Sequence, residues 1–328
     1  MIYIIYLSIP IISFILLKQY FLFANKKSIL DEPKENRSIH KAVTPTGAGI
    51  IIILNGLVFS SFILYFFYNK NISLAFSFCI LFLVLISFVD DLISLSIKVR
   101  ILSYIFVVIG LMFSYEGQSL ISNFNLWKFF LFFMSLWFLN LYNFMDNSDL
   151  TLYTNYISFS VIIIVIGIFG IIQIDYHNKV IIICFFLSLL PYVYFNKPIA
   201  KMFLGDSGSI TLAFIALWLI FYFYKISNYY VIAIFSTFFI DTTFTLLKRI
   251  LKKENIFKAH KQHLNQVYIE RNGIDKFVKI NLITHLLLIV TIIYSQFYRL
   301  EYILFLIIVL IINIIYFFII NVRVVKTL

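Results

Sequence analysis

The segment Lys201-Met-Phe-Leu-Gly205-Asp206-Ser-Gly208-Ser209 is a polar turn that opens directly into the apolar run 208–224. Glycines let a backbone come close to an anion, and the N-terminus of a helix favours negative charge. Asp206 could bind a cation at such a helix start while backbone N–H groups bind phosphate oxygens. An ordinary helix-capping turn would explain the same residues without any ligand. The segment therefore predicts an apolar helix with either an ordinary cap or a phosphate and metal site at its start.

The rest of the chain is too apolar for a soluble domain. Of its 328 residues, 62% are hydrophobic and only 12% are charged, whereas soluble domains have about a quarter charged residues. Mean hydropathy is +0.99. Crossing a bilayer takes roughly 17–25 apolar residues. The sequence predicts an all-α, polytopic integral membrane protein of one domain, 1–328, with these spans: 2–24, 47–68, 72–89, 101–115, 126–143, 157–174, 180–195, 208–224, 229–247, 279–297 and 301–321.

Basic residues are divided unequally between the two sets of loops, and this predicts the orientation. One set holds most of the Lys and Arg residues, whereas the other holds only Lys70, Lys179, Lys225 and Arg299. Cytoplasmic loops carry the basic excess, so we expect the N-terminus outside and the C-terminus inside. The net charge of +11 then reflects orientation and contact with anionic lipids rather than nucleic-acid binding. The cytoplasmic loops are expected at 25–46, 90–100, 144–156, 196–207 and 248–278.

Two adjacent acids, Asp90 and Asp91, end another apolar run, and nothing in the nearby sequence neutralises them. Neighbouring carboxylates repel each other, so sites that hold them usually supply a divalent cation, a cationic partner or a shared proton. A solvated helix end is the weaker alternative, because the helix dipole disfavours anions at a C-terminus. The pair therefore indicates a functional site.

A second acidic motif consists of Asn143, Asp146 and Asp149 after a further apolar run. Three-residue spacing puts these side chains on one face of a helical turn. Such a face suits the donor groups of a nucleotide or the hydration shell of Mg²⁺. A solvated turn rich in Asn and Asp is the alternative.

Histidines and lysines in two other loops are weaker candidates. His260 and His263 lie three residues apart in the basic loop 248–278, which is either a helix on the membrane surface or a substrate-binding loop. Zinc would need further nitrogen or sulfur ligands that the loop lacks, so contact with a diphosphate is the better functional interpretation. Lys41 lies in a segment whose Pro and Gly residues either break the chain before a helix or admit a ligand.

Together and in this order, the motifs resemble the polyprenyl-phosphate N-acetylhexosamine-1-phosphate transferase superfamily, glycosyltransferase family 4, from His40 to about Gly273. The signature is Phe-Leu-Gly-Asp-Ser-Gly-Ser after Lys201, with Asn143-Phe-Met-Asp146-x-x-Asp149 upstream. Asp241-Thr-Thr-Phe-Thr-Leu-Leu-Lys-Arg249, followed by Ala-His-x-x-His, is similar to the branch that initiates O-antigen and common antigen rather than to the muramoyl-pentapeptide branch.

The resemblance implies a Mg²⁺-dependent enzyme, with Mn²⁺ as a substitute, in the bacterial inner membrane and with a cytoplasmic active site. It would move a sugar 1-phosphate from a UDP-N-acetylhexosamine to undecaprenyl phosphate, release UMP and start a lipid-linked surface glycan. A homodimer and either single or double displacement stay open. The implied roles are catalytic for Asp90, Asp91 and His263; substrate-binding for Asn143, Asp146, Asp149, Lys201, His260 and Lys41; and metal-binding for Asp206 and Asp91.

The sequence departs from the family pattern in two places. Asn147, Ser148 and Leu150 stand where the second motif usually reads Asp-Gly-Ile-Asp-Gly, and Asn265 and Gln266 stand where later histidines are usual. The competing class is a transporter or a polyprenyl-phosphate-binding protein without turnover. Transporters hold ionisable groups near the bilayer midplane, whereas the acids here end helices on the expected cytoplasmic side, which favours an enzyme.

Overall fold

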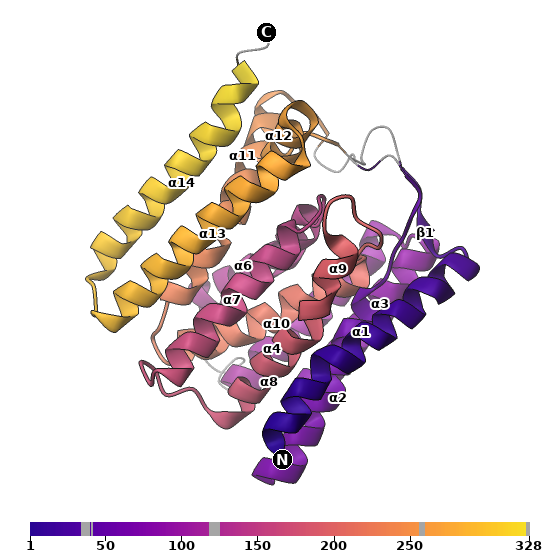
Figure 1. Ribbon diagram of the computed structural model, residues 1–328. Helices are drawn as coiled ribbons and strands as arrows, with labels where there is room; N and C mark the ends of the chain where they lie inside the picture. Colours follow the sequence, from indigo (N-terminus) through magenta and orange to yellow (C-terminus); the bar gives the residue numbers. More distant parts are fainter. Residues whose placement is uncertain (34–39, 41, 118–124, 256–259, 326–328) are drawn as a thin grey trace.

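The computed structural model describes residues 1–33, 40, 42–117, 125–255 and 260–325 (Figure 1). The long helices are α1 (Ile2–Lys26), α2 (Gly49–Tyr68), α3 (Leu74–Ile93), α4 (Ile97–Glu116), α6 (Leu126–Met145), α7 (Thr151–Ile168), α8 (Tyr176–Leu189), α10 (Asp206–Lys225), α11 (Ser236–Leu251), α13 (Ile274–Phe297) and α14 (Tyr302–Val325). The short elements are η1 (Leu190–Tyr192), α9 (Val193–Asn196), η2 (Tyr230–Phe235), α12 (Leu264–Asn272), and the antiparallel pair β1 (Leu30–Asp31) and β2 (Thr44–Pro45).

Within the described residues, eleven helical segments are long and apolar enough to cross a bilayer. Two of them are interrupted: α8 continues through η1 into α9, and η2 leads directly into α11. The all-α class and the eleven spans expected from the sequence are confirmed. The N-terminus and the end of α14 lie at opposite ends of the bundle, as an odd number of crossings requires (Figure 1).

Helix α10 is the central helix of the bundle. In its most apolar stretch 83% of the residues are buried, against 17% in α1 and 28% in α14. It packs against α2, α3 and α6, while the outer helices expose apolar side chains such as Ile11 and Ile307, as expected for a surface that faces lipid. The start of α10, which carries Asp206, is therefore fixed in the middle of the fold.

The starts of α2 and α10 touch backbone to backbone. A Cβ atom added to Gly49 would overlap the Cα atom of Gly208, and one added to Gly208 would meet Leu204 and Gly49. The backbone N–H of Gly49 also donates to the carbonyl of Leu204 at 2.8 Å. The sequence left two uses open for such glycines, a plain turn before a helix and close approach of a ligand, but the space beside these two is filled by the partner helix.

The sixth span is displaced from its expected position at 157–174, because α7 is Thr151–Ile168. Its polar first turns are satisfied inside the bundle rather than by water. Asn155 is fully buried, donates to the carbonyl of Ile234 at 3.0 Å and accepts from the hydroxyl of Tyr142 at 3.1 Å. The connection from α6 is therefore 146–150 and not the expected loop 144–156.

Helix α12 corrects one of the two interpretations of the basic loop. Its apolar residues Leu264, Tyr268 and Ile269 are buried against Phe277 of α13 and Tyr316 of α14. A helix lying on the membrane surface would instead expose one face to lipid. The segment after α11 is thus packed onto the bundle.

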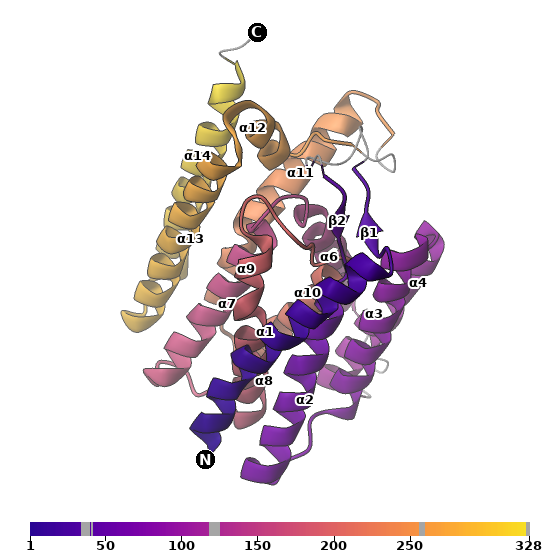
Figure 2. The same ribbon diagram turned by 45° about the vertical axis from the view of Figure 1, so that its right-hand side comes forward.

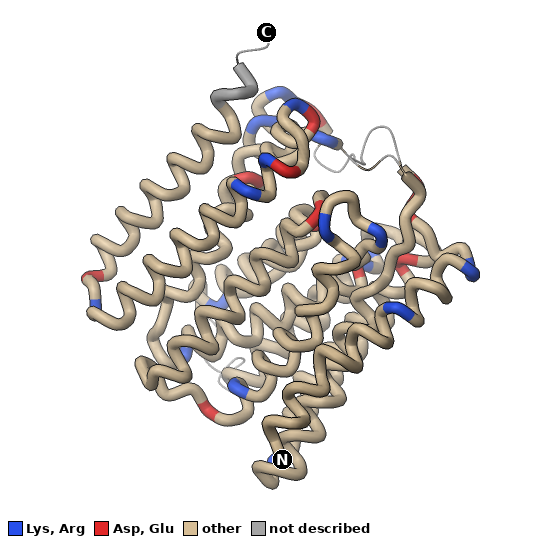
Figure 3. Tube along the Cα trace, in the orientation of Figure 1, with Lys and Arg blue, Asp and Glu red and all other residues tan. Residues whose placement is uncertain are grey.

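Charged side chains gather at one end of the molecule. Figure 3 shows most Lys, Arg, Asp and Glu at the end where α12 and the loop after α9 lie, and few at the end that holds the N-terminus. Figure 2 shows β1 and β2 at the same charged end. The four motifs found in the sequence therefore share one end of the bundle.

Candidate active site

Asp91, at the end of α3, caps the start of α10. Its two carboxylate oxygens accept the backbone N–H groups of Asp206 at 2.7 Å and Ser207 at 3.2 Å. Gly205 has a φ of +75°, and a Cβ atom there would lie 2.5 Å from Asp91 Oδ2. Glycine is required on both counts, since an L side chain disfavours this φ and would strike the carboxylate. The cap brings the side chains of Asp91 and Asp206 together.

Arg100 neutralises the other acid of the pair. Its guanidinium lies 2.7 Å from Asp90 Oδ2, donates to Asp90 Oδ1 at 2.9 Å, and lies 3.6 Å from Asp206 Oδ2. Of the three ways of holding paired acids that the sequence left open, the structure provides a cationic partner for Asp90. The missed signal is geometric: α4 begins at Ile97, directly after α3 ends, so a residue in its first turn returns to the end of α3.

The connection 146–150 brings a fourth carboxylate to this cluster. Burial, together with the charges of Asp206 and Asp149, raises the pKa of Asp146 to about 7. The described residues provide no hydrogen-bond donor to the Asp146 carboxylate, so a ligand can use it. Asn143 lies one turn earlier, at the end of α6, and its carbonyl accepts the Asp146 N–H at 3.2 Å.

Two contacts hold the far side of this connection. Asp149 accepts the backbone N–H of Ala200 at 3.0 Å, and burial raises the pKa of Asp149. Leu150 has a φ of +61° and donates its N–H to Asn196 Oδ1 at 2.8 Å. The turn keeps a left-handed residue at a position where the family usually has glycine.

His263 is buried and is oriented by Asp241, an acid to which the sequence patterns assigned no role in the site. Its Nδ1 lies 3.0 Å from Oδ1 of Asp241 on α11, and a carboxylate can only accept. Nδ1 therefore donates to Asp241, and Nε2 is the ring nitrogen that can face a ligand. Asp241 also accepts the N–H groups of Leu264 at 3.0 Å and Asn265 at 2.9 Å, so one carboxylate caps α12 and fixes the imidazole.

His260 stacks on His263 with the ring centroids 5.0 Å apart. Burial, together with the charges of His263 and Arg249, lowers the pKa of His260 to about 4. Its Nδ1 accepts the Gln262 N–H at 3.3 Å. His260 is thus a neutral ring at pH 7, which supports its neighbour rather than supplying charge to an anion.

The two lysines expected to bind substrate lie elsewhere. Lys201 is exposed, and its Nζ lies 4.4 Å above the ring centroid of Tyr194. Lys41 lies outside the described residues. The structure thus brings Asp90, Asp91, Asp146 and Asp206 together around Arg100, and it puts Lys201 at an outer edge.

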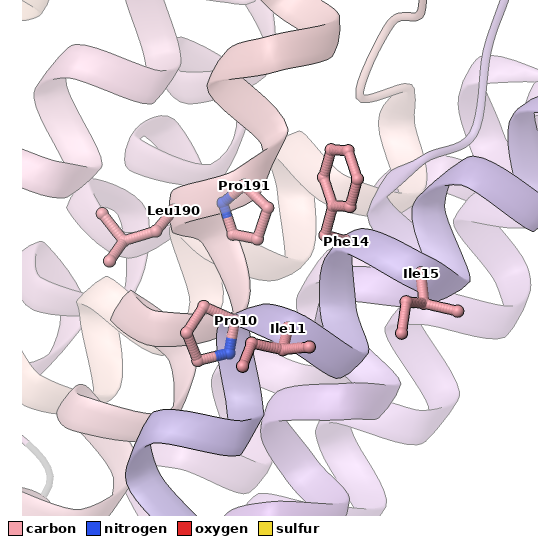
Figure 4. Close-up of a pocket in the computed structure, with 6 residues that line it drawn as sticks. All are labelled: Pro10, Ile11, Phe14, Ile15, Leu190 and Pro191. Atoms are coloured by element: carbon pink, nitrogen blue, oxygen red, sulfur yellow. The ribbon is translucent and has the colours of Figure 1, made fainter.

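A groove lined by apolar side chains lies apart from these acids. It lies between α1 and the α8–η1 junction, has a cavity volume of about 420 Å³, and contains no charged group (Figure 4). It is lined by Pro10, Ile11, Phe14, Ile15, Leu190 and Pro191. A small cavity of about 10 Å³ does reach the acidic cluster, where Asp90, Arg100 and Tyr104 line it.

Metal binding by the protein alone is not supported, because the described residues contain no group of three or more His, Cys, Asp or Glu arranged to hold an ion. Mg²⁺ is usually bound by one or two carboxylates together with substrate phosphates. Asp206 and Asp146 fit that requirement as hard oxygen ligands at one site. Asp91 is already engaged by two backbone N–H groups.

Two comparisons with known proteins agree with this geometry. The model of the family described as "Glycosyl transferase family 4" matches residues 73–224. The undecaprenyl-phosphate alpha-N-acetylglucosaminyl 1-phosphate transferase of Thermotoga maritima is 26% identical over 267 residues, which cover 80% of each chain. Residues 73–224 of the chain are thus similar to glycosyl transferase family 4.

The matched segment runs from the start of α3 to the end of α10. It includes the Asp90–Arg100 pair, the connection that carries Asp146, and the capped turn at Asp206. His263 and Asp241 lie beyond the matched segment, in α11 and the start of α12.

Proposed function

We propose that this chain transfers an N-acetylhexosamine 1-phosphate from its UDP-sugar to undecaprenyl phosphate and releases UMP. The observation that carries the proposal is the cluster of Asp90, Asp91, Asp146 and Asp206 around Arg100, because it lies where a central helix starts at the charged end of a membrane bundle. The name of the Thermotoga maritima relative makes UDP-N-acetylglucosamine the first donor to test.

In the proposed reaction, an oxygen of the acceptor phosphate attacks the phosphorus bonded to the sugar. The bond from that phosphorus to the bridging oxygen breaks, and the bridging oxygen leaves with UMP. A phosphate monoester has its second pKa near 6, so the acceptor is mostly a dianion at pH 7 and needs little help from a base. Direct single displacement is the simplest mechanism that this charge state supports.

The acid pair of α3 then has a positioning role. Both oxygens of Asp91 hold the start of α10, and both oxygens of Asp90 hold Arg100. Neither carboxylate is left as an unengaged base or nucleophile. Arg100 would offset part of the negative charge that these acids present to two anionic substrates.

Asp206 and Asp146 are the residues that we propose hold Mg²⁺ together with the donor diphosphate. When bound, the ion would offset the negative charge of the diphosphate and of the departing UMP. The Nε2 atom of His263, held by Asp241, would contact the same diphosphate. Lys201, stacked on Tyr194 at the outer edge, would contact the anionic head groups of lipids.

The orientation belongs to the same proposal. Nucleotide sugars are cytoplasmic, so the charged end would face the cytoplasm and the N-terminus would lie outside, in the inner membrane of a bacterium. The basic excess at this end supports that assignment.

Purified protein should be incubated with Mg²⁺, undecaprenyl phosphate and a panel of UDP-sugars, with UMP and the lipid product measured together. We expect equimolar UMP and lipid-linked sugar with at least one UDP-N-acetylhexosamine. Saturable binding of polyprenyl phosphate without UMP from any donor would instead favour the non-enzymatic, lipid-binding class.

A further inference from the structure

Two connections that are far apart in the sequence meet beside Asp146. The side-chain nitrogen of Asn265, at the start of α12, donates to Oδ1 of Asn147 at 2.6 Å and to the Ser148 hydroxyl at 3.4 Å. The side-chain nitrogen of Asn147 in turn faces Oδ1 of Asn265 at 3.4 Å. The two amides thus form a reciprocal pair.

Asn265 is the fixed half of this pair. Its side chain is fully buried, and its backbone N–H donates to Asp241 Oδ2 at 2.9 Å. Its Oδ1 also accepts the backbone N–H of Gln266 at 2.7 Å. A buried amide with all of these partners has little freedom to move, so it can hold a more exposed segment in place.

Asn147 is the held half, and it directly follows Asp146. The far side of the same connection is anchored by Asp149 on Ala200 and by Leu150 on Asn196. Like charges on neighbouring carboxylates push such a connection outward. The contacts at Asn147, Asp149 and Leu150 oppose that push, and all three residues closely follow Asp146 in the connection.

We propose that Asn147 and Asn265 form an amide clasp that positions Asp146 for the UDP-sugar, so that the clasp sets donor affinity. The inference rests on the proposed function and extends it to two positioning residues. Both are positions where this chain departs from the family pattern. The contact between them gives a reason for the joint departure, because each amide supplies the partner that the other needs.

The test compares Asn147→Ala, Asn265→Ala and the double variant, with kcat, the KM for each substrate and the thermal midpoint measured for all. A lost hydrogen bond of this kind changes an equilibrium by about 3- to 10-fold. We expect the donor KM to rise by about that factor in each single variant. The acceptor KM should stay constant, and the double variant should be no worse than the more affected single variant.

A second amide pair provides the matched control. Asn228 donates to Gln296 Oε1 at 3.3 Å, near the ends of α10 and α13 that lie away from the acidic cluster. Asn228→Ala should lower the thermal midpoint without changing the donor KM. Because Asn265→Ala removes a fully buried amide and could misfold, the half-buried Asn147 keeps the test decisive.

Three results would overturn the clasp. These are an unchanged donor KM in Asn147→Ala, additive losses in the double variant, or a loss of stability alone, as in the control. If the wild-type protein releases no UMP, the proposed function fails separately, and UDP-sugar affinity is then measured by calorimetry on the same variants. Equal affinities in wild type and Asn147→Ala would also refute the clasp.

Discussion

At the scale of single residues, two acids at one helix start have different tasks. Asp91 accepts the N–H groups that begin α10, whereas the side chain of Asp206 points to the Arg100 side of the cluster, 3.6 Å from its guanidinium. Asp91 stabilises the turn, whereas Asp206 is a side chain that the turn holds toward the cluster. Substitutions can therefore separate folding from chemistry.

We predict that Asp206→Asn keeps the fold and loses most of the activity. The Asp91 cap uses only the backbone of residue 206, so the turn survives while the proposed metal ligand loses its charge. Removing one electrostatic stabiliser commonly lowers the rate by about 10²- to 10³-fold. UMP release and the thermal midpoint are the measurements, and near-normal turnover by a folded variant would remove Asp206 from the metal site.

The raised pKa of Asp146 predicts how stability depends on pH. Its folded-state pKa of about 7 lies above the unfolded value of about 3.9, so the folded protein binds more protons between these limits. Stability contributed by the protonated carboxyl is present at low pH and is lost as pH rises through about 7.

In Asp146→Asn this contribution disappears. The wild-type thermal midpoint should fall relative to that of the variant between about pH 4 and about pH 7, measured without Mg²⁺. Parallel curves for the two proteins would show that Asp146 ionises normally in the fold.

At the scale of elements, the connection between α6 and α7 keeps its geometry without glycine. Leu150, at φ +61°, is held by Asn196, and an L residue in this region costs about 1–2 kcal/mol. This backbone strain is confined to Leu150, so a substitution at that residue can relieve it or increase it.

Leu150→Gly should be tolerated, with activity retained, because relief of the backbone offsets the lost side-chain contacts. Leu150→Val should lose about 1–2 kcal/mol of stability, since β-branched residues are the least suited to positive φ. Chemical denaturation of both variants provides the measurement. Equal stability of the Val and Gly proteins would mean that this turn is not strained.

The crossing of α2 and α10 depends on two glycines. Gly49→Ala would drive a methyl group into the backbone of Gly208, and overpacking of this kind costs about 1–3 kcal/mol. Because this crossing places Asp206, activity should fall together with stability.

Gly167→Ala is the matched control, since its methyl group would lie 3.2 Å from the flexible end of Ile174. That variant should change little by the same assays. A Gly49→Ala protein as active and stable as the control would show that the helices separate easily.

At the scale of the whole molecule, the charged end is predicted to face the cytoplasm. Single cysteines at Ser94 and Lys252 should resist a membrane-impermeant thiol reagent in intact cells, whereas cysteines at Lys70 and Arg299 should react. The native Cys79 and Cys184 are buried, so the background is low. Reaction at Ser94 or Lys252 in intact cells would reverse the orientation and separate the cluster from cytoplasmic UDP-sugars.

Much of this architecture was predictable because hydropathy acts locally. A backbone in lipid must satisfy its hydrogen bonds within each segment, so each apolar run predicts a helix wherever the run occurs. Eleven spans, the all-α class and the shared end of the four motifs follow from this rule. The rule fails at α7. Polar residues near its start, such as Asn155, form hydrogen bonds with other helices, and hydropathy along the chain does not reveal these partners.

The sequence by itself determined which residues carry charge, where the helices run and which family pattern they resemble. Only the tertiary structure decided what each charge contacts: Arg100 on Asp90, Asp91 on the start of α10, Asp241 on His263, and Asn265 on Asn147. Each of these contacts joins side chains on different elements, at distances of 3.0 Å or less. Spacing along the chain cannot specify them, because they depend on how the helices cross, and that is set by packing at sites such as Gly49 and Gly208.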